Sequence, residues 1–315
     1  MIASRELNEY IRRFGLLLSI GVLVAVLGVV SPDFLALQNI LNLLLQATVN
    51  AIIAGGMTLV ILTAGIDLSV GSVLALTAVI TADILKMGLP VPLAVLAGLG
   101  VGGLAGMVNG LLVTRGRIPP FIATLGMMTL ARGLALSYAA GRPITGLPDS
   151  FGAIGVSSIA GIPTPIWVTA LVYGLGTFLL RSTVPGRYIY AIGNSGRAAR
   201  FAGVPVRRIT LLVYVISGVL AALAGMILTA RLDSAQPIMG QQYELNAIAA
   251  VVVGGAALSG GRGGLGGTVL GALLMAIIAN AINIMNISPF IAQVVQGTVI
   301  LLALLLHGLG QREQS

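Results

Sequence analysis

The sequence predicts an all-α fold, a polytopic helical membrane protein with about ten transmembrane helices and with both the N- and the C-terminus in the cytoplasm. First, 57% of its 315 residues are hydrophobic and 8% are charged, whereas roughly a quarter of a soluble domain is charged. Second, apolar segments of about 20 residues, the length that crosses a bilayer, recur along the chain. Third, Lys and Arg are concentrated in alternate connecting segments. Residues 1–315 are therefore expected to form a single transmembrane domain.

Ten segments are candidate spans. The first is expected to be retained rather than cleaved as a signal peptide, because Ser-Pro-Asp-Phe follows it in place of a small-residue cleavage site. The second and the eighth are the weakest, because polar residues interrupt their ends. The ten candidates are 14–30, 43–63, 69–86, 91–113, 119–139, 165–181, 209–230, 243–258, 265–285 and 289–308.

The orientation follows from the distribution of basic residues. With the N-terminus inside, 13 of the 17 Lys and Arg residues fall in cytoplasmic segments. The outer segments hold Lys86, Arg142 and Arg231, and Arg132 lies within the fifth span. This bias fits an even number of spans with both ends inside. Two errors in the number of spans that cancel would leave the same distribution of basic residues.

Glycine is abundant, with 43 residues, and recurs at small-xxx-small spacing. Such spacing places small residues on one helix face and lets two helix backbones approach closely. The two series are Gly102–Gly106–Gly110 and Gly263–Gly267–Gly271. Segments 51–72 and 247–267 also resemble each other weakly, since each runs from small apolar residues through a Gly-rich break into a new span. Transporters are often built from such repeats, with the breaks near the pathway.

The sequence lacks the motif for an ATP site of its own. A P-loop needs Gly-Lys followed by Ser or Thr, and the single lysine, Lys86, stands between Leu85 and Met87. The G-x-G-x-x-G patterns carry no dinucleotide site, because no strand precedes them and no soluble βαβ unit surrounds them. No catalytic residues, cofactor or metal site is expected, and nothing in the basic charge requires nucleic acid.

Asp67 lies between two apolar segments, in TAGIDLSVGS (63–72). An acid at membrane depth is costly and is a functional candidate by default. It is also well placed, with Ser69 close behind, to cap the helix that follows. Capping and a role in the pathway or its gating both remain open, and the two are compatible.

Amide side chains recur within the spans, with Gln46 and Asn50 four residues apart and Asn280 and Asn283 three apart. Each pair shares a helix face. Interhelical hydrogen bonds are one use of such amides. The other is to line a polar route for a hydroxyl-rich solute. We take Asn50, Asp67, Asn280 and Asn283 as the candidate pathway residues.

The longest predicted cytoplasmic loop, GRYIYAIGNSGRAARFAGVPVRR (186–208), contains five arginines. Asn194 or Ser195 can cap a short helix, which Gly203 closes just before Pro205. The arginines obey the positive-inside rule and suit anionic lipid. A short helix across the inner mouth of a bundle also suits a docking protein. The five are Arg187, Arg197, Arg200, Arg207 and Arg208.

Several stretches closely resemble ribose-type sugar permeases, the membrane subunits of bacterial ABC (ATP-binding-cassette) sugar importers. Together with the hydropathy, the resemblance covers nearly the whole chain. The stretches are TLVILTAGIDLSVGS (58–72), FIATLGMMTLARG (121–133), GRYIYAIGNSGRAARFAGV (186–204), DSAQP (233–237) and YELNAIAAVVVGGAALSGGRG (243–263).

The resemblance implies a permease of the inner membrane that translocates ribose or a related monosaccharide. It implies a second copy of the permease, an ABC ATP-binding subunit that hydrolyses ATP, and a periplasmic sugar-binding protein. It also implies that residues 193–204 form the segment that couples to the ATPase. Many relatives carry an acid where this chain has Ser195. The expected coupling residues are Gly193, Asn194, Arg197, Ala198, Ala199, Arg200 and Gly203.

Two further expectations concern the outer face and the energy source. Arg142 and Arg231 are expected to meet carboxylates of the binding protein. The alternative function is an ion-coupled secondary sugar transporter. Such a transporter needs carboxylates within the membrane, and Asp67 is the one fair candidate.

Overall fold

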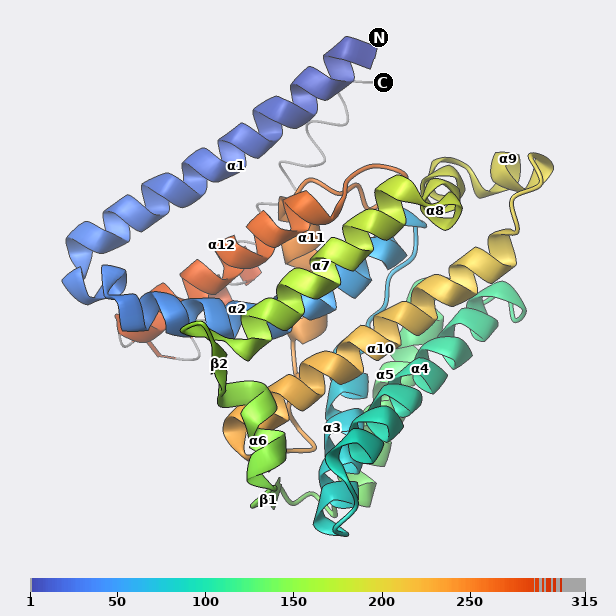
Figure 1. Ribbon diagram of the computed structural model, residues 1–315. Helices are drawn as coiled ribbons and strands as arrows, with labels where there is room; N and C mark the ends of the chain where they lie inside the picture. Colours follow the sequence, from blue (N-terminus) through green and yellow to red (C-terminus); the bar gives the residue numbers. More distant parts are fainter. Residues whose placement is uncertain are drawn as a thin grey trace.

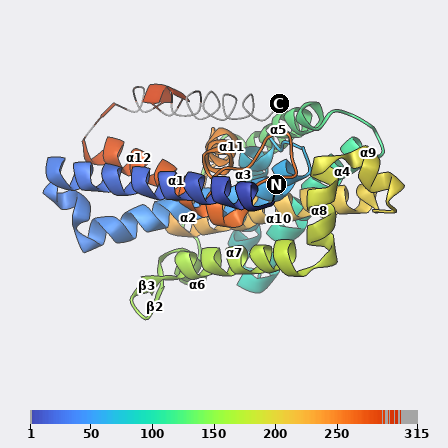
Figure 2. The ribbon, with the colours of Figure 1, turned by 90° about the horizontal axis from the view of Figure 1, so that it is seen from above.

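A computed structural model of the chain describes residues 2–285 and, beyond them, residues 287, 288, 291, 293–295, 297, 298 and 301. Long helices run beside one another through the molecule, as two views at 90° to each other show (Figure 1 and Figure 2). α8 and α9 lie at one end of the bundle, with the turn between α4 and α5, and we call this the α9 end. β1 and α6 lie at the other, the β1 end (Figure 1).

Helices make up most of the described residues, and the strands are two residues long. The helices are α1 (Ile2–Val30), the 3-10 helix η1 (Pro32–Leu35), α2 (Leu37–Leu62), α3 (Val70–Lys86), α4 (Val91–Thr114), α5 (Pro120–Tyr138), α6 (Asp149–Val156), α7 (Thr164–Ser182), α8 (Val184–Asn194), α9 (Gly196–Phe201), α10 (Val206–Leu232), α11 (Tyr243–Val253) and α12 (Leu265–Ile284). The strands are β1 (Ile144–Thr145), β2 (Ser158–Ile159), β3 (Ile162–Pro163) and β4 (Ser234–Ala235).

Five helices in the described part of the chain are long and apolar enough to cross a membrane, namely α2, α4, α5, α10 and α12. A sixth span arises if α7 and α8, which are bent by 75° at their junction, are counted as one. The all-α polytopic fold is thus confirmed. The count of ten and the cytoplasmic termini stay predictions, and the tenth predicted span, 289–308, lies largely outside the described residues.

Three predicted spans differ clearly from the helices that form. The first was expected from residue 14, but α1 begins at Ile2. The second was expected from residue 43, but α2 begins at Leu37 and has 26 residues. The eighth was expected over 243–258, but α11 ends at Val253 after 11 residues. Gly255 explains this end, because its φ of +92° belongs to a conformation that glycine adopts without strain.

Large apolar side chains face outward along the long helices. On α4, Leu93, Leu96 and Leu104 are exposed, and on α7 so are Leu175 and Phe178. An aqueous surface would not favour so many exposed apolar groups. A surface of this kind is what lipid tails cover.

Both predicted glycine series form close helix contacts. In the first, a side chain at Gly102 would overlap the carbonyl of Gly218, and one at Gly106 would overlap the carbonyl of Tyr214, so α4 packs backbone to backbone on α10. In the second, Gly267 and Gly271 lie equally close to α11. The expected close approach of helices is confirmed at both places.

The two Gly-rich breaks that resemble each other in sequence meet in space. The first joins α2 to α3 and the second joins α11 to α12. The amide of Gly261, in the second break, donates to the carbonyl of Leu62 at the end of α2, at 3.0 Å. Gly260 packs against Ala64 in the first break. Both repeats are therefore helix–break–helix units with touching breaks.

Short strands and turns close the β1 end. β1 pairs antiparallel with β4, with Ile144 opposite Ala235. The amide of Leu147 donates to Asp233 Oδ1 at 2.9 Å, and Lys86 Nζ donates to the carbonyl of Gly146 at 3.3 Å. These bonds join the ends of α3 and α10 to the segment before α6.

Candidate functional site

The predicted short helix in the arginine-rich loop forms as α9. Ser195 is its N-cap, with a side-chain oxygen that accepts from the amide of Ala198 at 3.2 Å. Gly203, at φ +79°, closes it, and its amide donates to the carbonyl of Arg200 at 3.1 Å. Of the two candidate caps, Ser195 is thus the one that acts, and Asn194 is the last residue of α8.

α8 is a helix that the sequence analysis did not anticipate. Thr183 caps it, accepting from the amide of Gly186 at 3.3 Å, and Pro185 stands in its first turn. A capping residue followed by Pro is a helix-start signal, so the sequence did contain the information. With α8 in place, α9 is held at a corner of the α9 end (Figure 1).

α9 has one face toward the protein and one toward solvent. Ala199 is 5% exposed and belongs to the core. The α9 outer face consists of the exposed residues Arg197, Ala198, Arg200 and Phe201. Phe201 is 87% exposed, and the sequence analysis did not single it out. An exposed aromatic ring among arginines has the composition of an interface hot spot.

The base of α9 rests on the two breaks. A side chain at Gly193 would overlap the carbonyl of Leu62 and the amide of Gly261. The side chain of Asn194 occupies the space where Gly261 would carry its own. The predicted coupling residues Gly193 and Asn194 thus connect α9 to the end of α2 and to the second break.

Asp67 is at the centre of a buried polar cluster. It is 1% exposed. Its Oδ1 accepts from the amide and the hydroxyl of Ser69, at 3.0 and 2.6 Å. Its Oδ2 accepts from the hydroxyl of Ser217 on α10 at 2.8 Å. Ser69 is the N-cap residue of α3, and its side chain makes no capping hydrogen bond. Asp67 therefore binds the N-cap residue itself and accepts from no amide within the helix.

The cluster joins the first break to three helices. Asn109 on α4 donates to the hydroxyl of Ser69 at 2.9 Å. The carbonyl of Ile66 accepts from Thr124 on α5 at 3.2 Å and from Tyr214 on α10 at 3.5 Å. Because unpaired buried polar groups are costly, these bonds hold the break in one conformation.

Arg132 holds a second irregular segment, residues 236–242, between β4 and α11. Its guanidinium, on α5, donates to the carbonyls of Pro237 and Met239 at 2.7 and 2.8 Å. Gly240 packs directly against Gly71 in the first turn of α3. Buried backbone that leaves regular structure must find hydrogen-bond partners in the protein, and Arg132 supplies them for the buried Pro237 and Met239. The sequence analysis placed Arg132 in a span but gave it no role.

The candidate pathway amides have different surroundings. Asn280 and Asn39 form a reciprocal pair, with N–O distances of 3.0 and 3.2 Å, as interhelical hydrogen bonding predicts. Asn283 is exposed. Asn50 has a buried Oδ1 without a hydrogen-bond partner. In the part of the chain that the structure describes, no hydrogen bond joins any two of Asn50, Asp67, Asn280 and Asn283.

The two outer docking candidates lie at the β1 end but differ in accessibility. Arg142 is exposed in the turn before β1. Arg231 is half-buried, and its guanidinium donates to the carbonyl of Leu45 on α2 at 2.9 Å. Arg231 therefore also links α10 to α2.

Comparison with known proteins places the chain in a family. Residues 39–304 match the family model described as the branched-chain amino acid transport system / permease component. The chain belongs to this family of permease components. It is thus a transport subunit and a multi-pass integral protein of the bacterial inner membrane.

The permease is similar to several curated proteins. It is 46% identical to the ribose import permease protein RbsC of Haemophilus influenzae, over 97% of each chain. It is 46% identical to RbsC of Escherichia coli K12, over 92% of this chain and 91% of that one. It is 47% identical to RbsC of Bacillus subtilis, over 94% and 92%. No solved structure matches the permease significantly.

Proposed function

We propose that this permease is the membrane-spanning subunit of an ATP-driven importer that carries ribose or a closely related monosaccharide. The observation that carries the proposal is the 46% identity to a ribose import permease over 97% of both chains. The sequence has no P-loop, so an ATP-binding subunit supplies the hydrolysis. A periplasmic sugar-binding protein delivers the solute.

The ATPase binds at the α9 outer face, which places the α9 end in the cytoplasm. Phe201 is the anchor, and Arg197 and Arg200 pair with carboxylates around it. Ala199 and Gly203 shape the helix behind this face. Movement of the ATPase reaches the membrane through Gly193, because that residue has no space to shift independently of Leu62.

The transport route runs along the broken elements. α3 and α11 both begin inside the bundle, where Gly71 lies against Gly240. Half-helices of this kind surround the solute in many transporters. Asn50 has a free acceptor for a sugar hydroxyl. Asp67 and Asn280 are proposed to act by exchanging hydrogen-bond partners when the breaks move, and Asn283 through its exposed amide.

The sugar-binding protein binds at the β1 end, where Arg142 is the accessible cation. Arg231 joins this face only if its bond to Leu45 opens. Two copies of the permease form the assembly, since one α9 engages one ATPase and ATP closes the ATPases as a pair.

The ion-coupled alternative is disfavoured. Asp67 accepts two hydroxyl donors and one amide and is enclosed on all sides. A carboxylate in such a site stabilises the structure. Within the described part of the chain it has no open access through which a transported proton could bind and leave.

The test is uptake of labelled ribose into proteoliposomes that hold the permease with its ATPase and binding protein. Uptake is expected to need internal ATP and to persist with a proton ionophore. Uptake that does not depend on ATP and is abolished by the ionophore would show that the protein is a secondary transporter. Competition by unlabelled sugars then ranks the substrates.

A further inference from the structure

An open hollow of about 460 Å³ lies at the α9 end, beside the α9 outer face, with which it shares Arg200. Three separate segments surround it, which are the α4–α5 turn, α9 and the start of α10. Its lining residues are Val113, Thr114, Arg117, Ile118, Pro119, Pro120, Arg200, Val206, Arg207 and Thr210.

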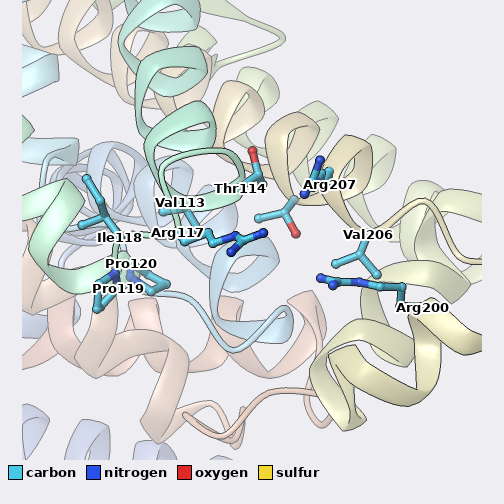
Figure 3. A pocket seen from close by; sticks show the side chains of 10 residues that line it. Val113, Thr114, Arg117, Ile118, Pro119, Pro120, Arg200, Val206 and Arg207 are labelled. Carbon is cyan, nitrogen blue, oxygen red and sulfur yellow. The ribbon is translucent and has the colours of Figure 1, made fainter.

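Three arginines line this hollow and no acid does. Arg117 and Arg200 extend toward each other from opposite sides (Figure 3). Arg117, Arg200 and Arg207 are all exposed. Cations gathered around one space repel one another unless an anion enters it. Guanidinium groups that converge from separate segments are suited to the several oxygens of a phosphate.

The position of Arg117 is built into the turn. Its φ is +56°, which is uncommon for a residue with a side chain. The main-chain amides on either side are held by hydrogen bonds. Gly116 donates to the carbonyl of Leu111 at 3.1 Å, and Ile118 donates to the carbonyl of Leu112 at 3.2 Å. The turn therefore fixes the backbone of Arg117 at the rim of the hollow.

The apolar surroundings point to a lipid. Directly after Pro119 and Pro120, helix α5 exposes Phe121, Ile122 and Leu125, at 51%, 50% and 39%. These residues begin a membrane-crossing helix. If the phosphate of a phospholipid occupied the hollow, the acyl chains of that lipid would thus lie along α5. Basic hollows between membrane helices bind anionic headgroups in this manner.

The geometry points to a binding site for the phosphate of one anionic phospholipid, held by Arg117, Arg200 and Arg207. The site also touches the coupling apparatus of the proposed function. Arg200 also lines a second hollow, together with Gly196, Arg197 and Phe201. A lipid bound to Arg200 in the first hollow would therefore fix the orientation of α9.

The test is native mass spectrometry of the purified permease titrated with palmitoyl-oleoyl phosphatidylglycerol or with the matching phosphatidylcholine. The wild type is expected to retain one phosphatidylglycerol selectively. The double variant Arg117→Gln, Arg207→Gln should bind it roughly 25-fold more weakly, since each arginine near a lipid phosphate contributes about fivefold. The matched control is Arg187→Gln, on α8, which removes an exposed arginine at the same end without touching the hollow.

Equal lipid retention in the double variant and the control overturns the site. So does displacement of the lipid by inorganic phosphate at millimolar concentration, because the free anion would then be the ligand. Unchanged lipid binding with weaker capture of the ATPase would assign the arginines to protein docking and also overturn it. Because this readout needs neither ATP nor sugar, its failure is separable from failure of the proposed function.

Discussion

Gly193, near the end of α8, lies directly against the main-chain carbonyl of Leu62, the last residue of α2. The same carbonyl accepts the amide of Gly261 at 3.0 Å. One oxygen thus joins the end of α8, the end of α2 and the second break. The absence of a side chain at Gly193 is what allows the three to meet.

Gly193→Ala should weaken the coupling of ATP hydrolysis to transport. The added methyl overlaps backbone, which cannot move aside as a flexible side chain would, and overpacking of this kind costs about 1–3 kcal/mol. We expect ribose uptake per ATP hydrolysed to fall several-fold in proteoliposomes. Gly196→Ala is the control, because nothing lies within 4 Å of its added methyl. Equal losses in both variants would refute the role of the contact.

Phe201→Ala should weaken binding of the ATPase. An exposed aromatic anchor contributes roughly 2 kcal/mol or more, which corresponds to about 30-fold in affinity. The affinity of the purified ATPase for the permease in nanodiscs measures it. Phe178→Ala, on α7, removes a ring that is 61% exposed on the apolar surface and should leave the affinity unchanged. If Phe201→Ala binds the ATPase as tightly as the wild type does, Phe201 is not the anchor.

Ser217→Ala should destabilise the permease. It deletes the donor to Asp67 Oδ2 and leaves a buried carboxylate oxygen unpaired, at a cost of about 1–3 kcal/mol. A lower thermal unfolding temperature in detergent is the expected observation. In the background Asp67→Asn the same change should cost less, because the charge is gone. Ser137→Ala, at an exposed position of α5, should fall within about 0.5 kcal/mol of the wild type.

Arg132→Lys should loosen residues 236–242 while retaining the positive charge. A guanidinium reaches the carbonyls of Pro237 and Met239 together, whereas an ammonium is a single point. Hydrogen exchange of amides in this segment should accelerate, and ribose uptake should fall. Arg142→Lys, at the exposed turn, serves as the control for the exchange rates. Exchange rates that do not change would show that other contacts hold the segment.

Gly106→Ala should separate α4 from α10. The new methyl would overlap the carbonyl of Tyr214 and forces the two backbones apart. We expect a loss of about 1–3 kcal/mol, read as a lower unfolding temperature. Gly100→Ala on the same helix meets nothing within 4 Å and should be neutral or slightly stabilising, because Ala favours helix. An equal drop in both variants would show that the contact with Tyr214 is not what destabilises Gly106→Ala.

Features with local signals could be predicted from the sequence. Ser195, Gly203 and Pro205 bound α9 correctly because caps and stops act within a few residues. The glycine series predicted close packing because their spacing reports one helix face. The Thr183–Pro185 signal for α8 was of the same kind and was overlooked.

Features that depend on distant partners could not be predicted. Asp67 meets Ser217 across 150 residues, and Arg132 meets Pro237 across 105. Neither spacing leaves a periodic pattern. The exposure of Phe201 was hidden for the same reason, because it depends on how α8 sets the direction of α9.

The seam between α4 and α10 also limits how the permease can change shape. At Gly102, Gly106 and Gly218 the two helices touch through main-chain atoms, which have no alternative rotamers. The pair must therefore rotate or tilt as one rigid body in any change between outward and inward access. Helices can shift relative to each other where side chains form the contact. One such contact joins α7 to α2, where Tyr173 donates to the carbonyl of Ala51 at 2.9 Å.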